Sequence, residues 1–208
     1  MTTKYPLIEG IDIHNPSPAH EANAAFLRSF PIDRAVFRLY ARSPGTFLPI
    51  MSVLDSILSG EKRTIQLLDY QLIVLRMTGL INAEYLFGIN EPISRLNGLG
   101  DDKIEALRKG LTSKELIAMG TWTERQQCIL TLVEESIRTY DNKEETILWA
   151  KRIMSDDEVV ECFVVLGFYT TIARMTKGLR VQKDPVIPHL ETAIVDTITK
   201  NERDGVEA

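Results

Sequence analysis

The sequence is poor in the residues that most often bind metals or carry redox chemistry. It has two cysteines and three histidines among 208 residues. Cys128 and Cys162 lie far apart, each within an apolar helical pattern, and no Cys-x-x-Cys is present. A dithiol redox centre therefore has no support, and we interpret both cysteines as buried small apolar residues. His14, His20 and His189 lack the spacing of metal ligands, so we expect no bound metal.

An excess of positive charge is also missing. The net charge is −5, and no run is rich in lysine or arginine. Nucleic-acid binding normally needs a basic surface, so the composition argues against it. We find no apolar run of membrane-spanning length, and residues 1–20 lack a continuous apolar region followed by a small-residue cleavage site. We therefore expect a cytoplasmic protein that contacts neither nucleic acid nor membrane.

The composition is otherwise that of an ordinary globular protein. Apolar residues make up 44% of the chain and charged residues 25%, which is enough apolar material for one sizeable core. Residues 1–17 hold turn-forming residues and two prolines, so we predict an N-terminal arm there. We expect a single all-α domain over residues 18–180 and a C-terminal extension over residues 181–208.

Apolar residues recur at helical spacing through most of the chain, and no alternating pattern bounded by hairpin turns appears. Thr123 and Ser155 open capping boxes at the start of two long apolar segments. We predict an all-α fold with eight or more helices around one core. Helices that are apolar on several faces also suggest surfaces buried between subunits. The predicted helices cover residues 18–29, 32–42, 46–58, 65–79, 82–97, 101–109, 123–140, 143–153 and 155–178, with a last short one near 189–199.

The segment that begins at Ala83 reads "AEYLFGINEP" and mixes polar residues into an apolar helix. Residues three, four and seven apart share a helix face, so Ala83, Leu86 and Asn90 form one stripe. Pro92 has no N–H, and the carbonyl of Gly88 therefore loses its usual partner. Such an irregularity sometimes marks a site and often marks only a kink, so both interpretations stay open.

The run "QLIVLRMTGLINAEYLFGINEPISRLNGLGDDKIEALRKG" resembles the central motif of the carboxymuconolactone decarboxylase / alkylhydroperoxidase D-like family. Members commonly read like "SEYEW…H…PIARxxGLSDEEIxAL". The segments "TERQQCILTLVEES" and "SDDEVVECFVVLGFYTTIARMTKGL" are similar to later helices of the family, so the resemblance covers about residues 35–180. It implies an alkylhydroperoxidase D-like all-α fold with a helical-hairpin core. It also implies assembly as a homo-oligomer, either a trimer, a hexamer or a dimer.

The sequence departs from the redox-active branch of that family. The branch carries Cys-x-x-Cys and a histidine on the central helix and a glutamate on the preceding one. The matching positions here are Ala83, Leu86, Asn90 and Gln71. A thiolate is the attacking species in peroxide reduction, so we expect no peroxidase or disulfide reductase activity. The two amides form hydrogen bonds but do not transfer protons near neutral pH.

Two functions remain. The first is a cofactor-independent lyase or isomerase that decarboxylates, isomerises or cyclises a small oxygenated substrate such as a lactone, a keto acid or a polyketide-like intermediate. It works by positioning, amide hydrogen bonds and one carboxylate, which is Glu84 if burial between helices raises its pKa. The alternative is a non-catalytic, oligomeric small-molecule-binding protein that kept the fold. The enzyme requires the polar atoms of Gln71, Glu84 and Asn90 to converge on one cavity.

Eight residues follow as candidates for the site. The carboxylates, the tyrosines and the arginine among them also have a structural interpretation: an exposed or ion-paired carboxylate, a core aromatic residue with a bonded hydroxyl, or the partner in an internal ion pair. A guanidinium could instead bind a substrate carboxylate. We predict Glu84, Asn90, Gln71 and Tyr169 as catalytic residues and Tyr85, Arg76, Glu91 and Phe87 as substrate-binding residues.

Overall fold

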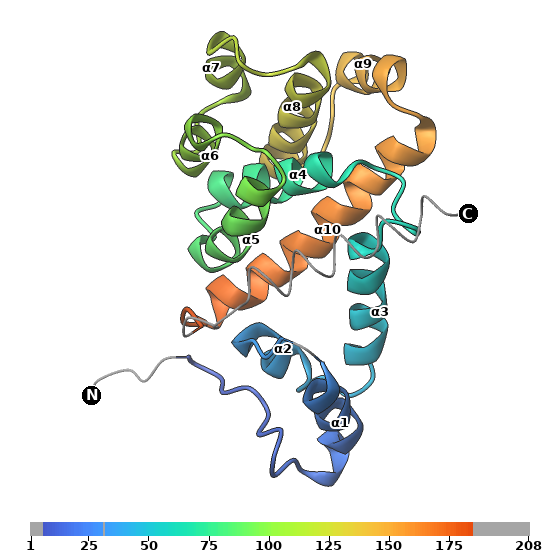
Figure 1. Cartoon of the computed structure of the whole chain (residues 1–208), viewed down its shortest axis with the longest axis vertical. Helices are drawn as coiled ribbons and strands as arrows, with labels where there is room; N and C mark the ends of the chain where they lie inside the picture. The colour runs from blue at the N-terminus through green and yellow to red at the C-terminus, as the bar shows by residue number, and fades with distance from the viewer. Residues whose placement is uncertain (1–5, 31, 185–208) are drawn as a thin grey trace. The chain divides into compact units, whose positions relative to one another are not determined.

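The computed structural model describes residues 6–30 and 32–184, and in these residues it contains helices and no strand. The all-α prediction is therefore confirmed. A 3-10 turn, η1 (Pro18–His20), precedes ten α-helices (Figure 1). These are α1 (Glu21–Ser29), α2 (Ala35–Tyr40), α3 (Phe47–Leu58), α4 (Leu67–Leu80), α5 (Glu84–Leu96), α6 (Asp101–Arg108), α7 (Ser113–Ala118), α8 (Glu124–Thr139), α9 (Glu144–Ile153) and α10 (Asp156–Gly178).

The helix boundaries follow local capping signals. Thr123 accepts a hydrogen bond from the backbone of Gln126, whose side chain bonds back, which is the predicted capping box at the start of α8. Helix α7 is absent from the helices predicted from the sequence. Its own capping box, formed by Thr112 and Glu115, was the available signal. The helix predicted near 189–199 lies outside the described residues.

The chain packs as two compact units. One is Met1–Arg63 with Arg174–Ala208, and the other is Thr64–Ala173, so α10 belongs mostly to the second unit. The domain boundaries expected at residues 17 and 180 were placed on turn-forming residues and remain a prediction.

In the first unit, side-chain hydrogen bonds to the backbone join short helices. Buried Asn23 donates from Nδ2 to the carbonyl of Ala41 at 2.9 Å. Asp184 accepts from the backbone N–H of Ala35 at 2.8 Å. Part of the predicted arm also packs in this unit, because Ile11 and Ile13 are buried.

Helix α4 is the centre of the second unit. It packs against α5, α6 and α8. Twelve of its fourteen residues are buried, because it carries apolar residues on every side. At Gly79 the helix approaches α6 so closely that an added Cβ would lie 2.1 Å from the carbonyl oxygen of Leu107. Only glycine allows this spacing, and the approach holds α4 and α6 together.

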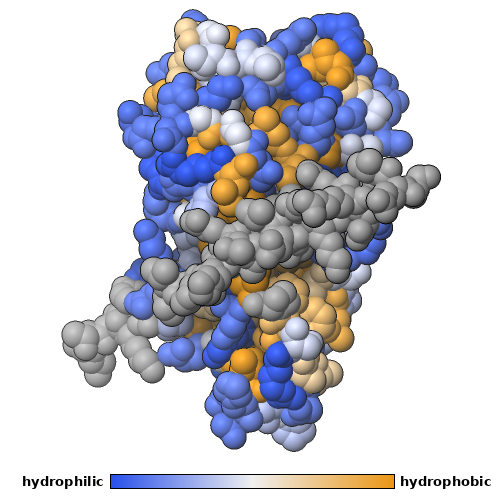
Figure 2. Space-filling model, viewed as in Figure 1, coloured by the Kyte–Doolittle hydropathy of each residue, from blue (hydrophilic) through white to orange (hydrophobic). Residues whose placement is uncertain are grey.

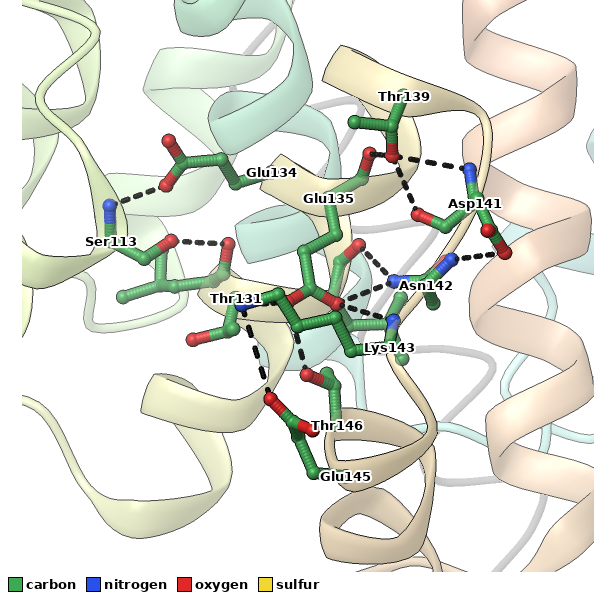
Figure 3. A network of polar contacts seen from close by, with 12 residues as sticks. Ser113, Thr131, Glu134, Glu135, Thr139, Asp141, Asn142, Lys143, Glu145 and Thr146 are labelled. Carbon is green, nitrogen blue, oxygen red and sulfur yellow. Dashed lines mark hydrogen bonds and ion pairs between the residues drawn. The ribbon is translucent and has the colours of Figure 1, made fainter.

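A polar network fixes the turn between α8 and α9 (Figure 3). Glu135 accepts hydrogen bonds from the backbone N–H of Lys143 at 3.2 Å and from Oγ1 of Thr146 at 3.1 Å. Asn142 donates to the carbonyl of Leu132 at 2.9 Å. A carboxylate at the N-terminal end of α9 also complements the helix dipole. The surface around α6–α9 is largely hydrophilic in the face shown in Figure 2.

Candidate functional site

Helices α4 and α5 form the helical hairpin that carries the predicted site. Asn82 turns the chain between them with a φ of 51°, a left-handed conformation that asparagine tolerates. The backbone N–H of Ala83 then donates to the carbonyl of Thr78 at 2.8 Å. This tight connection brings Gln71 on α4 opposite Ser94 on α5.

Gln71 on α4 and Ser94 on α5 lie within hydrogen-bonding distance between these helices, and Ser94 also reaches the backbone of Asn90. We name these three buried residues the Gln71–Asn90–Ser94 cluster. Ser94 Oγ lies 2.9 Å from Oε1 of Gln71 and 2.9 Å from the backbone carbonyl oxygen of Asn90. Asn90 donates from Nδ2 to the carbonyl of Leu86 at 2.8 Å. Gln71, Asn90 and Ser94 are 1%, 3% and 0% exposed. Ser94 therefore joins the side chain of Gln71 to the backbone of Asn90, and a polar chamber shared by positions 71 and 90 stays a prediction.

The amide of Gln71 is incompletely bonded. Its Oε1 end faces Ser94, whereas Nε2 is buried without a hydrogen-bond partner among the described residues. Leaving a buried polar group unpaired costs about 1–3 kcal/mol. The cluster therefore retains unused hydrogen-bonding capacity inside the protein.

Ser94 was absent from the predicted site. The family motif reads "PIAR" where this chain reads "PISR", so a hydroxyl stands at the position of an alanine. That departure was the signal that could have found it. It is a third departure from the motif, beside glutamine in place of glutamate at position 71 and asparagine in place of histidine at position 90.

Glu84 does not meet the condition set for its catalytic role, which was burial between helices, and it fits the structural interpretation of an exposed, ion-paired carboxylate. Its side chain is 61% exposed and pairs with Arg108, with 3.4 Å between Oε2 and Nη1. Glu84 is the first residue of α5 and is exposed, so the burial that its proton-transfer role required is lacking.

Glu91 also pairs with cations on the surface of α5. Burial raises the pKa of Glu91, but the hydrogen bond from Arg95, at 2.8 Å, and the charge of Arg108 outweigh it, so the pKa lies below its ordinary value. Arg108 also bonds Glu91 and lies over the ring of Phe87, with 4.2 Å between the guanidinium carbon and the ring centroid. Neither carboxylate forms a hydrogen bond within the cluster, and Phe87 has a structural partner.

The two candidate tyrosines are core residues. Tyr169 on α10 forms a buried hydroxyl–hydroxyl hydrogen bond with Tyr70 on α4, and either hydroxyl can be the donor. The two rings meet edge to face. Tyr85 is buried at the start of α5. The core interpretation accounts for both, and their roles in a site remain predictions.

Arg76 is fully buried and forms the internal ion pair that was its structural interpretation. Its Nη2 lies 2.7 Å from Glu134 and 3.3 Å from Oγ of Ser113, and Nη1 donates to the carbonyl of Leu111. Burial lowers the pKa of Arg76 to about 10, although the charge of Glu134 acts in the opposite direction. Both terminal nitrogens of the guanidinium are therefore bonded to protein groups, and Nε is buried without a hydrogen-bond partner among the described residues.

Cys128 and Cys162 are both fully buried. Burial raises the pKa of Cys128 to about 11 and that of Cys162 to about 12. Near neutral pH both are therefore thiols and not thiolates. Over residues 6–30 and 32–184, no group of three or more His, Cys, Asp and Glu side chains is arranged to hold a metal ion.

Helix α10 corrects one sequence expectation. Its 23 residues are long and apolar enough to cross a membrane by length and composition. Of its most apolar stretch, 44% is buried inside the protein. The core helix of a globular protein passes the same test, so one such helix is weak evidence for a membrane span. Length and composition alone therefore do not decide between a core helix and a membrane span.

No family model matches the sequence, and no curated protein matches it. Two solved structures are similar. One is a protein of unknown function from Agrobacterium tumefaciens, proposed to be the antioxidant defence protein AhpD. It has a TM-score of 0.59 and 20% identity, over 70% of this chain and 94% of that one. The other is an uncharacterized peroxidase-related protein from Silicibacter sp. TM1040. It has a TM-score of 0.68 and 13% identity, over 88% of this chain and 95% of that one.

These likenesses establish the fold. The chain has the alkylhydroperoxidase D-like all-α fold, in agreement with the resemblance of residues 35–180 to that family. The names of the two neighbours describe those proteins, and at such low identity they carry no activity over to this chain.

Proposed function

We propose that the Gln71–Asn90–Ser94 cluster binds a small oxygenated organic molecule, such as a lactone, a keto acid or a polyketide-like intermediate. We further propose that the chain acts on it as a cofactor-independent lyase or isomerase. The observation that carries the proposal is the Gln71 amide, which is buried, held at one end by Ser94 and unpaired at the other. A group that costs stability in the free protein is expected to gain a partner in a complex.

Decarboxylation, isomerisation and cyclisation suit such a cluster. They proceed when a substrate is held in its reactive conformation and fixed dipoles match the oxygen atoms whose charge changes. Two amides and a hydroxyl supply neutral dipoles of this kind. Because Glu84 and Glu91 form ion pairs with Arg108 on the surface, proton transfers would pass between groups of the substrate or through water.

Thiol peroxidase activity is not part of the proposal, although the structural neighbours are named for antioxidant defence and peroxidase relationship. Ala83 and Leu86 stand where the redox branch has cysteines. The remaining cysteines are buried thiols with raised pKa values.

The second candidate is binding without turnover. One observation favours it: the described contacts of the cluster are all made by neutral groups, and Glu84 is not among them. A protein that kept the fold and lost the chemistry would have such a cluster. Both candidates share the same ligand-binding residues and differ only in whether product forms.

Entry of a ligand requires a local opening, because the cluster is buried. Pro92 lies inside α5 and cannot donate to the carbonyl of Gly88, so this turn lacks one helical hydrogen bond. We propose that α5 opens at this turn, beside Asn90.

The test begins with the small molecules that copurify with the full chain, identified by mass spectrometry. These compounds and a panel of lactones and keto acids are incubated with the wild type and with Gln71→Met and Asn90→Leu. Product formation by the wild type, reduced roughly a hundredfold or more in both variants, would support the enzyme. Thr78→Val is the matched control, because Thr78 is equally buried and its hydroxyl bonds only its own helix.

The other outcomes are equally informative. Binding by the wild type without product would establish the non-catalytic alternative. Unchanged turnover in both variants would remove the cluster from the mechanism, and reduction of an organic hydroperoxide would contradict the non-redox assignment.

We also propose a cytoplasmic homo-oligomer that contacts neither nucleic acid nor membrane. The net charge of −5 supports the exclusion of nucleic acid. Apolar residues exposed on α10 support self-association.

A further inference from the structure

The hydroxyl of Ser94 has one proton but lies at hydrogen-bonding distance from two acceptors. Oγ is 2.9 Å from Oε1 of Gln71 and 2.9 Å from the carbonyl oxygen of Asn90. A serine hydroxyl donates one hydrogen bond and accepts others. With the Gln71 amide in this orientation, only one of the two contacts is a hydrogen bond, and Nε2 has no partner.

Turning the amide by half a rotation about its last side-chain bond removes the conflict. The two ends of a glutamine amide are nearly equal in size, so the surrounding hydrogen bonds decide its orientation. Nε2 then donates to Ser94 Oγ, and 2.9 Å is an ordinary distance for that bond. The Ser94 proton is free for the carbonyl of Asn90, four residues earlier, which is a common bond for serine in a helix.

The turned orientation is better bonded in two respects. It makes two hydrogen bonds at Ser94 in place of one. It also leaves an unpaired carbonyl oxygen in place of an unpaired NH₂ group, and buried N–H groups without a partner are the rarer of the two in proteins. The Asn90 side chain does not compete, because its Nδ2 is committed to the carbonyl of Leu86.

We infer that Ser94 is the positioning residue of the cluster: it holds the NH₂ group of Gln71, so that in the ligand-free protein Oε1 is the end left open to a ligand. An open carbonyl oxygen accepts a hydrogen bond and cannot donate one. Resting on the proposed function, this narrows its ligands to molecules that present a hydroxyl, such as an alcohol or the enol form of a keto acid, and excludes a lactone that carries no hydroxyl group.

Nuclear magnetic resonance on the full ¹⁵N-labelled chain tests the orientation without a ligand. The side-chain amide signals of Gln71 are identified by their loss in Gln71→Met. We expect a strong nuclear Overhauser effect between these amide protons and the β-protons of Ser94. We also expect solvent exchange of the amide protons to become about fivefold faster in Ser94→Ala, because the loss of one hydrogen bond changes an equilibrium by about that factor. Thr78→Val is expected to leave the exchange rate unchanged.

The wild-type measurement decides the question even if Ser94→Ala does not fold. Amide protons distant from the Ser94 β-protons in the wild type would overturn the inference. That result would leave the proposed function standing, because the turnover test does not depend on which end of the amide is open.

Two probes of matched shape test the ligand class. Cyclohexanol presents a hydroxyl, whereas cyclohexanone presents only an acceptor. We expect the alcohol to shift the Gln71 amide signals at a concentration about fivefold lower than the ketone, and Ser94→Ala to lose this preference. Equal binding, a preference for the ketone, or no binding of either probe would overturn the assignment to hydroxyl-bearing ligands.

Discussion

The buried charged side chains of α4 each pair with an opposite charge on α8, and these ion pairs determine how much stability a substitution removes. Asp69 on α4 lies 2.7 Å from Nε of Arg125 on α8, and Arg125 also reaches Glu158. Arg76 on α4 pairs with Glu134 on α8 in the same way. Asp69 and Arg76 are thus charged side chains on a helix that is otherwise mostly apolar and buried. Removing one partner of either pair leaves the other charge buried without an opposite charge beside it.

Arg76→Met is expected to lower the free energy of unfolding by about 3–5 kcal/mol, because it breaks a buried ion pair. Arg138→Met is the matched control. Arg138 pairs with the same Glu134 at 2.8 Å but is half-exposed, so its loss is expected to change stability by less than about 1 kcal/mol. Urea denaturation of the two variants checks this. Equal losses of unfolding free energy in the two variants would contradict the conclusion that the pair of Arg76 with Glu134 contributes more stability than the pair of Arg138 with Glu134.

The stability contributed by Glu134 depends on pH. Burial raises its pKa, but hydrogen bonds from Ser113 and the charge of Arg76 outweigh burial and place the pKa below its ordinary value of 4.5. A carboxyl group whose pKa is lowered by folding stabilises the protein above the unfolded pKa, and this contribution is lost as the pH falls through the folded pKa.

The difference in unfolding free energy between the wild type and Glu134→Gln is therefore expected to be constant near neutral pH and to shrink below about pH 4.5. Denaturant unfolding from pH 7 to pH 3 measures it. A difference that grows on acidification would show that the folded pKa is raised instead.

At the scale of elements, two helical glycines have opposite roles. Gly79 lies at the contact of α4 with α6, where a Cβ would meet backbone at 2.1 Å. Gly88 lies inside α5 with no atom in the way of a Cβ. Neither role can be read from the sequence, because it depends on whether another helix passes beside the glycine.

Gly79→Ala is expected to destabilise the protein by about 1–3 kcal/mol, because backbone cannot move aside cheaply. Gly88→Ala is expected to stabilise it by about 0.5–1 kcal/mol, since alanine favours a helix over glycine. Thermal and urea unfolding of both variants provide the measurement. A Gly79→Ala protein as stable as the wild type would mean that α4 and α6 are farther apart.

Predictions from sequence were most accurate for long helices. Helices α4, α5, α8 and α10 were expected within a few residues of their observed limits, because their apolar residues recur over many turns and capping residues mark the starts. Helix α7 was missed, although the capping box of Thr112 and Glu115 marks its start.

At the scale of the whole molecule, the outer side of α10 carries an apolar surface. Val160, Phe163 and Val164 are 62%, 37% and 48% exposed and lie on one side of the helix, whereas Cys162 and Val165 on the other side are fully buried. Exposed apolar groups of this kind are frequent at contacts between subunits. We propose that this surface is covered in a homo-oligomer.

Val160→Lys combined with Val164→Lys is expected to convert the oligomer to a monomer, because it places two charges where the partner packs. Light scattering coupled to gel filtration measures the mass. Leu148→Lys on α9 is the control, since Leu148 is half-exposed on another helix. A monomeric wild type would contradict the proposal. Cosedimentation of the wild-type protein with membranes would indicate instead that the surface contacts lipid.

The sequence by itself determined the fold class, the limits of the long helices and the absence of the thiol and imidazole groups at positions 83, 86 and 90. These depend on residue type and local spacing, which the chain carries along its length. Only the tertiary structure decided that Glu84 faces solvent, that Arg76 is paired and that Ser94 joins Gln71. Those facts depend on which faces of α4 and α5 pack against each other and on which residues of α8 lie beside α4, and side chains adjacent in sequence can point in opposite directions.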